Sequence, residues 1–311
     1  MGKTDRNQPK NAKSSDATTT VFDFEARFPN DAACLDELVG MLYPDGIFCP
    51  KCGKVTKHHR LAKRPAYACQ FCGRHEYPMK GTIFEGSSTS LKLWFYGMFL
   101  MASTRCGISA KQLEREVGVS YPTALRMFRQ IRSLLDQGDP ILDGTIEADE
   151  AYIGGANKWK HAAKRGHDTA FSSKTPVFGM AQRGANGKSG KVVAKAIPAA
   201  STSSVLPHIK TKVLPASTVY TDEGNAYNAL KGQGYEHQRV NHSQAIYVDG
   251  DVHVNTIEGF WSLLKSGIRG TYHSVSTKHL QSYLDEYAFR YNHRDEPGGM
   301  FNAFLRRIAK A

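Results

Sequence analysis

Long apolar runs are absent from this 311-residue chain. The longest apolar stretch, around residues 91–102, is shorter than the ~20 residues that cross a bilayer, and it contains Lys92. The first 20 residues are polar and lack the apolar core of a secretory signal. We therefore expect a soluble, intracellular protein that has no membrane partner.

Acidic residues are scarce relative to basic ones. The chain has 41 Lys and Arg against 29 Asp and Glu, which gives a formal net charge of +12. An excess of this size does not determine a fold, but it favours a polyanionic partner. A basic protein that is merely soluble is the alternative that charge alone leaves open.

Cysteine is also scarce, and its six residues are unevenly placed. Four of them form two Cys-x-x-Cys pairs separated by 16 residues, and a glycine follows each pair. In a reducing compartment this spacing indicates a closed, structural zinc site rather than disulfides, and a redox role for one pair does not account for the other. The predicted Zn²⁺ ligands are Cys49, Cys52, Cys69 and Cys72. A unit this small depends on its metal to fold.

Residues 107–132 have the pattern of a helix-turn-helix. Ser109 can cap a first helix, Gly118 ends it, and a second helix begins at about Tyr121. The inward positions of the second helix are predicted to be Ala124, Leu125, Phe128 and Ile131. Arg126, Arg129 and Arg132 are predicted to lie along its outer side and to contact DNA. A plain helical hairpin with a solvated arginine face is the alternative.

An unusually acidic strand is predicted at residues 145–153, followed by Gly154 and Gly155. It contains Glu147, Asp149 and Glu150, although acids are depleted in strands and a buried carboxylate needs a partner or a metal. Strand alternation places Glu147 and Asp149 on one face and Glu150 on the other. The strand either lies on a solvated edge or helps to hold a cation, and geometry alone leaves two candidate ligands on its first face.

Two further groups of acids follow in the chain. After two predicted strands at 174–183 and 191–198, a buried strand is predicted at 217–224, ending in the pair Asp222 and Glu223 and a glycine. A helix predicted at 256–269 contains Glu258 beside an apolar repeat at core spacing, formed by Ile257, Trp261, Leu264 and Ile268. The helical repeat places Glu258, Lys265 and Arg269 along one face. This order suits a three-carboxylate site for two divalent cations in an α/β domain, although an amphipathic surface helix with a row of charges has the same spacing.

Taken in order, the motifs resemble those of insertion-sequence DDE transposases with an N-terminal zinc ribbon. The resemblance covers about residues 30–295. It rests on both cysteine pairs, Gly107-Ile-Ser-Ala-Lys-Gln-Leu, Glu147-Ala-Asp-Glu-Ala-Tyr-Ile-Gly-Gly, Tyr220-Thr-Asp-Glu-Gly, His253-Val-Asn-Thr-Ile-Glu-Gly-Phe-Trp-Ser-Leu-Leu-Lys and Tyr287-Ala-Phe-Arg-Tyr-Asn-His-Arg. It implies an α/β catalytic domain with a ribonuclease-H-like mixed sheet and flanking helices.

The resemblance also implies roles for individual residues. The catalytic acids fall on Asp149, Asp222 and Glu258, which would hold Mg²⁺ or Mn²⁺, and Lys265 matches a basic residue near the DNA. Val254 stands where the family pattern leads us to expect Thr, which leaves the three acids unaffected.

The expected domains follow the order of these motifs. They are a disordered basic tail (1–20), a zinc-ribbon region (21–82), a helix-turn-helix region (83–138), a ribonuclease-H-like catalytic domain (139–300) and a C-terminal tail (301–311).

The activity that the resemblance implies is transposition. Metal-activated water would cut at the end of the element, and the freed 3′-hydroxyl would attack target DNA. The ribbon and the helix-turn-helix would recognise the terminal repeats, and a homo-oligomer would assemble on the DNA. We expect a cytoplasmic protein, associated with the nucleoid when DNA is bound. The alternatives are a metal-dependent nuclease of the same fold and a DNA-binding regulator.

Overall fold

The computed structural model describes residues 19–104, 106–136, 138, 140–154, 174–184, 190–222, 224–240, 253–296 and 299–308. The chain divides into two compact units. The first contains residues 1–104 and 293–311, and the second contains residues 105–292. The helix-turn-helix therefore belongs to the same unit as the acidic strand, and nearly all of the predicted tail at 1–20 lies outside the described residues.

Four helices form the body of the first unit: α1 (Val21–Arg27), α2 (Asp31–Leu42), α3 (Leu91–Ser103) and α9 (Gly299–Ile308). Asn30 caps α2 through the amide of Ala33, and α3 contains the longest apolar stretch of the sequence. The core is aromatic, with Phe24 stacked on Phe99 and both rings against Phe301.

The predicted C-terminal tail is wrong for residues 301–308, which belong to α9. Its apolar residues recur at helical spacing and are buried, so this segment completes the core of the first unit rather than extending from it. These residues are Phe301, Phe304, Leu305 and Ile308.

The cysteine-rich segment of the first unit forms two small antiparallel sheets. One pairs β1 (Phe48–Cys49) with β2 (Lys54–Val55), and the other contains β3 (His58–Arg60), β4 (Tyr67–Cys69) and β5 (His75–Glu76). Strands of two or three residues bury little apolar surface, so this segment depends on further cross-linking for stability.

The second unit begins with the helix-turn-helix, α4 (Ala110–Val117) and α5 (Tyr121–Ser133), which is followed by η1 (Leu134–Asp136). Ser109 caps α4 through the amide of Gln112, as predicted. Gly118 ends α4 in the left-handed region at a φ of 72°, which favours glycine.

One prediction for α5 is wrong. Arg126 and Arg129 are exposed, but Arg132 is buried, and Met127 rather than Leu125 is fully buried. The reason is that α5 packs against α8 (Thr277–Asn292) as well as against α4, so its buried face is wider than a two-helix motif requires.

A five-stranded mixed sheet forms the centre of the second unit. Its order is β10-β9-β6-β7-β8, in which β6, β9 and β10 are parallel and β7 and β8 run antiparallel to their neighbours. The strands are β6 (Thr145–Ile153), β7 (Thr175–Gln182), β8 (Val192–Ala196), β9 (Thr218–Thr221) and β10 (Glu236–Arg239). Short helices η3 (Asn225–Tyr227) and η4 (Lys231–Gln233) lie between β9 and β10.

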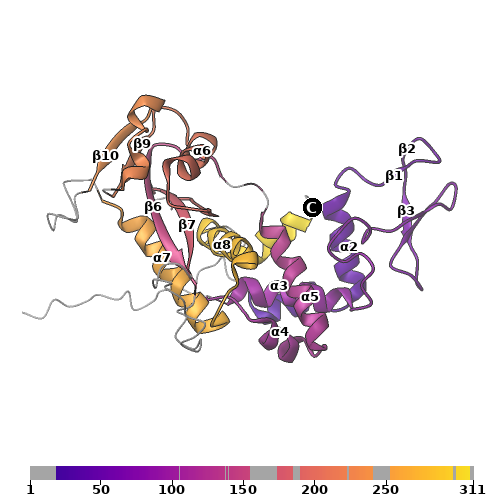
Figure 1. The fold of residues 1–311 in the computed structure, drawn as a ribbon. Helices are drawn as coiled ribbons and strands as arrows, with labels where there is room; N and C mark the ends of the chain where they lie inside the picture. The colour runs from indigo at the N-terminus through magenta and orange to yellow at the C-terminus, as the bar shows by residue number, and fades with distance from the viewer. Residues whose placement is uncertain are drawn as a thin grey trace, which may run out of the picture. The chain divides into compact units, whose positions relative to one another are not determined.

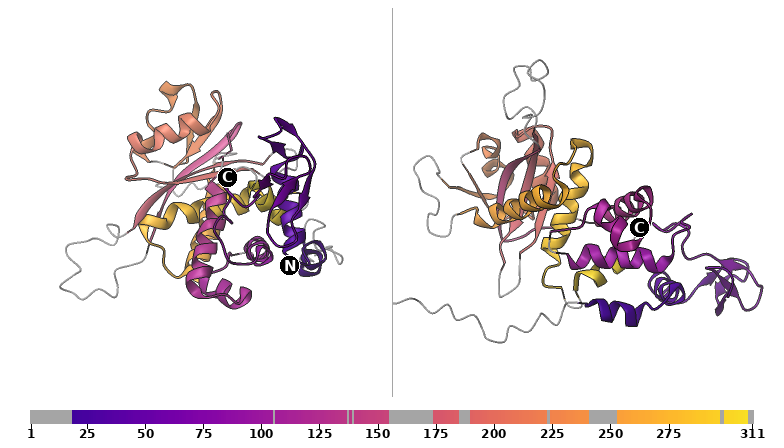
Figure 2. Two further views of the ribbon diagram at one scale, coloured as in Figure 1. Left: turned by 90° about the vertical axis from the view of Figure 1, so that its right-hand side faces the viewer. Right: turned by 90° about the horizontal axis from the view of Figure 1, so that it is seen from below.

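Helices cover both faces of this sheet (Figures 1 and 2). On one face, α7 (Asn255–Gly267) and α8 pack over alternate residues of β6, β7 and β8. On the other face, α6 (Thr202–Lys212) packs over the intervening residues. The predicted α/β class, a mixed sheet with flanking helices, is confirmed, and α7 continues into a π-helical turn, η6 (Ile268–Tyr272). None of the helices within the described ranges is long and apolar enough to span a bilayer.

Candidate active site and zinc site

Asp149 and Asp222 lie where the parallel ladder between β6 and β9 ends. Ala148 of β6 pairs with Thr221 of β9. Asp149 is the next residue of β6, which continues to Ile153, and Asp222 directly follows β9. Burial raises the pKa of Asp149 to about 6, and the nearby charge of Asp222 contributes to the rise. A buried carboxylate whose charged form is disfavoured by a neighbouring carboxylate would be stabilised by a bound cation.

Glu258 belongs to the first turn of α7, the helix that covers this face of β6, and its side chain is exposed. Its charge makes a further, smaller upward contribution to the pKa of Asp149. The carboxylate oxygens of the three acids nevertheless do not all lie within 4.8 Å of one another. Within the described parts of the chain, the four paired cysteines are the only group of three or more potential ligands whose atoms lie within 4.8 Å of one another.

A tryptophan that the sequence identified only as a core residue orients Asp149. Trp261 of α7 donates a hydrogen bond from Nε1 to Asp149 Oδ2 at 3.0 Å. The ring has room because Gly179 stands directly opposite Asp149 in the β6–β7 ladder. A Cβ at Gly179 would come within 2.5 Å of the Trp261 ring. The sequence could have indicated this contact, because the indole N–H of a buried tryptophan such as Trp261 needs a hydrogen-bond acceptor.

The two remaining acids of β6 point to opposite faces, as the alternation predicts. Glu147 is fully buried on the α7 side and accepts a hydrogen bond from Arg183 Nε at 2.7 Å. Glu150 lies on the other side beside Tyr227, without a well-formed hydrogen bond between the two side chains. Burial raises the pKa of Glu150 to about 7, and the charges of Asp222 and Asp149 add to the rise.

Lys265 and Arg269 line one pocket, as expected for two positions on the same helical face. The pocket has a volume of about 370 Å³ and lies between the end of β6 and the end of α7 with its π-helical turn. Lys174 and His273 also line it, so its walls contain four basic side chains. Glu258 does not line this pocket. Of the predicted row of three charges, Glu258 lies in the first turn of α7, Lys265 in its last turn, and Arg269 in η6.

The four paired cysteines converge in the first unit. Cys49 Sγ and Cys72 Sγ lie 3.5 Å apart, and Cys52 Sγ and Cys69 Sγ lie 3.9 Å apart. Tetrahedral zinc with Zn–S bonds of ~2.3 Å requires sulfur–sulfur distances of about 3.8 Å, so the spacing fits zinc. Gly53 and Gly73, which follow the pairs, have φ angles of 66° and 72°, a conformation that favours glycine.

A threonine that the sequence did not identify supports this cluster. Thr56 is buried, and its hydroxyl lies 3.2 Å from Cys69 Sγ. This hydrogen bond is the main cause that lowers the pKa of the Cys69 thiol to about 5. Thiolates are the form that binds metal, so the contact favours ligation.

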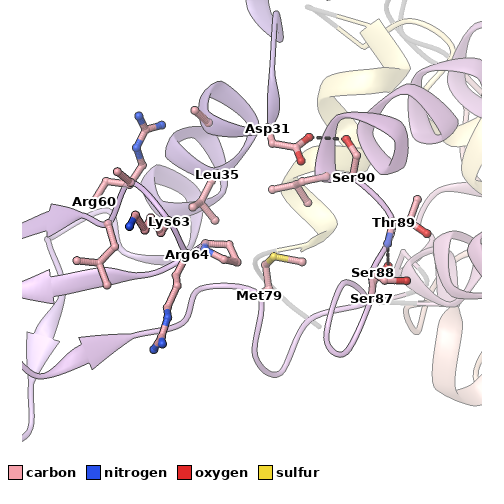
Figure 3. Close-up of a pocket in the computed structure, with 15 residues that line it drawn as sticks. Asp31, Leu35, Arg60, Lys63, Arg64, Met79, Ser87, Ser88, Thr89 and Ser90 are labelled. Atoms are coloured by element: carbon pink, nitrogen blue, oxygen red, sulfur yellow. Dashed lines mark hydrogen bonds between the residues drawn. The ribbon is translucent and has the colours of Figure 1, made fainter.

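A second pocket, of about 460 Å³, lies in the first unit between the β3–β4 hairpin and the loop before α3 (Figure 3). Arg60, Lys63 and Arg64 come from the hairpin, and residues 87–90 supply hydroxyl groups from the other side. Leu35 and Met79 form part of its apolar lining. Clustered guanidinium, ammonium and hydroxyl groups are typical of surfaces that contact phosphates.

Two families of known proteins match separate parts of the chain. Residues 141–292 match the ISXO2-like transposase domain, and residues 29–75 match the transposase zinc-ribbon domain. The first range includes all three predicted catalytic acids, and the second includes all four paired cysteines.

Two relatives agree with these matches. An uncharacterised protein of the transposable element ISH50 from Halobacterium salinarum is 30% identical over 283 residues, which cover 87% of this chain and 94% of that protein. An uncharacterised transposase-like protein from Haemophilus influenzae is 30% identical over 105 residues, or 34% of this chain and 84% of that protein. The crystal structure of a pre-cleavage Mos1 transpososome covers 65% of this chain and 73% of its own, at 12% identity and a TM-score of 0.24. The resemblance is therefore confirmed, and the chain belongs to the ISXO2-like transposases that carry a zinc-ribbon domain.

Proposed function

We propose that this transposase binds the terminal repeats of its insertion sequence and catalyses metal-dependent DNA cleavage followed by strand transfer. The observation that carries the proposal is that Asp149 and Asp222 directly follow the last pair of the β6–β9 ladder, on strands next to the helix that contains Glu258. Burial and mutual repulsion raise the pKa of Asp149, and a bound divalent cation would offset both.

The donor set fits Mg²⁺ or Mn²⁺. Asp149, Asp222 and Glu258 offer only carboxylate oxygens, which hard cations prefer, and the exposed Glu258 can approach the two aspartates when a cation draws the three together. Bound cations in such a site supply activation of the attacking oxygen and stabilisation of the leaving oxygen.

The residues of the chain position the reactants. Trp261 fixes the orientation of Asp149 through its hydrogen bond to Oδ2. Lys265, in the last turn of α7, and Arg269, in η6, provide positive charge where the DNA strand beyond the scissile phosphate would pass. Water, and later the 3′-hydroxyl of the cut strand, would attack a phosphodiester held between the acids and these cations.

DNA recognition is assigned to the basic surfaces of both units. Arg126 and Arg129 on the exposed side of α5 are in position to contact DNA, as in other helix-turn-helix proteins. The cations around the pocket in Figure 3 would contact phosphates, and Zn²⁺ held by the four cysteines would stabilise the ribbon that presents them. Because two ends must be joined, we also propose that the protein acts as a homo-oligomer on DNA.

The decisive experiment incubates purified protein with labelled terminal-repeat DNA and either Mg²⁺ or Mn²⁺. We expect wild-type protein to yield cut ends and end-to-target joined products, and Asp149→Asn and Asp222→Asn to yield neither while still binding DNA. Cut ends without joined products would indicate a nuclease instead. Binding without any cutting by the wild type would favour the DNA-binding regulator, and normal cutting by Asp149→Asn would refute the assignment of the acids.

A further inference from the structure

Glu147 is a carboxylate that has no role in the proposed reaction. It lies on β6 two residues before Asp149, and none of its side chain is exposed. A fully buried carboxylate is stable only when donors surround it. Its partners therefore indicate what it does.

Those partners come from the end of the neighbouring strand β7 and from the start of α7, the helix that packs over β6. From the end of β7, Arg183 donates Nε to Oε1 at 2.7 Å. From the start of α7, Thr256 donates its amide to Oε2 at 2.6 Å and its hydroxyl to Oε1 at 2.8 Å, and the amide of Ile257 donates to Oε2 at 3.1 Å. His253 Nδ1 lies 3.2 Å from Oε1. Both carboxylate oxygens thus accept hydrogen bonds from protein donors. We therefore do not count Glu147 among the metal ligands.

The contacts with α7 replace a cap that the helix does not have. Its N-cap residue is Val254, whose apolar side chain makes no capping hydrogen bond. The first amides of a helix lack partners within the helix, and their partial positive charge favours an anion. Glu147 satisfies two of these amides from a different strand, so the position of the helix end is tied to β6.

A second tie holds the same helix to the same strand. Trp261, about one helical turn after Ile257, donates to Asp149, which is two residues after Glu147. Glu258 lies on α7 between these two ties. A helix fixed at two points to one strand can neither slide nor rotate along it, so the two ties set where Glu258 stands relative to Asp149.

We infer that Glu147 is a positioning residue for the metal site: as an anionic cap supplied by β6, it fixes the start of α7 and thereby fixes the backbone position from which the Glu258 side chain approaches Asp149 and Asp222. The inference rests on the proposed function, because it assumes that these three acids are the ligands. It assigns Glu147 no contact with DNA or metal.

The test compares Glu147→Gln with Glu286→Gln, a second fully buried carboxylate whose partners lie on α5, α8 and η6. Glutamine keeps the size of Glu147 but offers one acceptor oxygen instead of two. We expect Glu147→Gln to fold, to bind Mn²⁺ about 10–100-fold more weakly in a calorimetric titration, and to need correspondingly more metal for half-maximal cleavage. Saturating metal should restore much of the cleavage rate. Hydrogen exchange at the amides of Thr256 and Ile257 should accelerate even without metal.

Glu286→Gln should lower thermal stability while leaving Mn²⁺ affinity and exchange at the start of α7 unchanged. Wild-type Mn²⁺ affinity in a folded Glu147→Gln protein, beside an inactive Asp149→Asn, would overturn the inference alone. Equal weakening of Mn²⁺ binding by Glu286→Gln would overturn it as well, because the effect would then follow from stability. Normal cleavage by Asp149→Asn would instead refute the proposed acids, and the inference with them.

Discussion

Arg132 of α5 and Glu286 of α8 form an ion pair with 2.6 Å between Nη2 and Oε2, and both side chains are buried. The guanidinium of Arg132 also lies 3.3 Å from the centroid of the Tyr283 ring. Arg290 donates to the other oxygen of Glu286 at 2.8 Å. The second helix of the helix-turn-helix is therefore joined to α8 in the core of the second unit by a buried charged network, and not only by its loop.

Replacing Arg132 with methionine should destabilise the second unit rather than weaken a DNA contact. Loss of one partner from a buried ion pair costs about 3–5 kcal/mol, because the other charge remains buried. We expect Arg132→Met to lower the melting temperature markedly in a thermal denaturation experiment. An unchanged melting temperature would show that the network does not contribute to stability.

The same network has a defined pH dependence. Burial alone would raise the pKa of Glu286, but the charges of Arg132 and Arg290 outweigh it and hold this pKa below its ordinary value. A lowered carboxyl pKa stabilises the native state above the unfolded pKa, and this stability is lost as the pH falls through the native value. Wild-type stability should therefore drop on acidification, and the drop should be smaller in Glu286→Gln.

Arg126 and Arg129 should affect DNA binding and not stability, because both are exposed on α5. We expect each alanine substitution to weaken binding to terminal-repeat DNA. If each arginine contacts one phosphate, the slope of log K against log salt should decrease by about 0.9 per substitution. Lys210→Ala, which removes an exposed positive charge from α6, serves as the control and should retain wild-type affinity. Equal losses in all three variants would point to overall charge as the cause.

Asp149→Asn should be more stable than the wild type above pH 6 when no divalent cation is present. The pKa of Asp149 is raised to about 6, so its charged form is penalised in the native state. This penalty is absent at low pH, grows as the pH rises from the unfolded pKa of ~3.9, and is complete above the native pKa. Between pH 4 and pH 8, the melting temperature of Asp149→Asn should therefore rise increasingly above that of the wild type.

Adding Mg²⁺ or Mn²⁺ should reverse that order. Binding to the native state alone stabilises it, so millimolar cation should raise the melting temperature of the wild type more than that of Asp149→Asn. An equal rise in both proteins would argue against Asp149 as a ligand.

Gly179→Ala should impair the site without touching any acid. The new Cβ would meet Trp261 at 2.5 Å, so the ring must move away from Asp149. We expect a loss of about 1–3 kcal/mol in the free energy of unfolding, typical of overpacking, together with reduced cleavage. Gly40→Ala is the matched control, because a Cβ there meets nothing within 4 Å. Wild-type cleavage by Gly179→Ala would show that the Trp261–Asp149 bond is dispensable.

Removal of zinc should unfold the ribbon and leave the second unit folded. Chelation, or Cys69→Ser, should release the metal, raise hydrogen exchange across residues 48–76 and weaken terminal-repeat binding. Cys106→Ser should keep its zinc, since this exposed cysteine lies outside the four-cysteine cluster. Unchanged exchange in the metal-free protein would show that the ribbon folds without an ion.

Local signals predicted much of the fold. Ser109 and Gly118 mark both ends of α4, and the apolar repeat Ile257, Trp261, Leu264 and Ile268 is buried against the sheet as expected. Alternation along β6 separates Glu147 from Glu150 correctly. Each of these features depends on neighbours within a few residues, which is why periodicity and capping residues are sufficient to find them.

Other features depend on partners far along the chain, and no local pattern indicates them. Arg132 has the spacing of an exposed arginine, but Glu286 lies 154 residues away and draws it inside. The partner of Trp261 is 112 residues away, and Gly179 matters only because it stands opposite Asp149. Residues 301–308 have only a short helical apolar pattern, and the aromatic partners that bury it lie far away, near the start of the chain.

The sequence by itself therefore determined the residue types that carry the chemistry and the order in which they occur: two cysteine pairs, a helix-turn-helix, and acids on two strands and a helix. Tertiary structure alone decided which acids lie close to one another and which acid instead binds the start of α7. Parallel pairing of β6 with β9 brings Asp149 beside Asp222, whereas Glu147, on the same face, is enclosed by Arg183 and the first turn of α7. The physical reason is that a carboxylate's role depends on its burial and on the donors around it, and both are set by long-range packing.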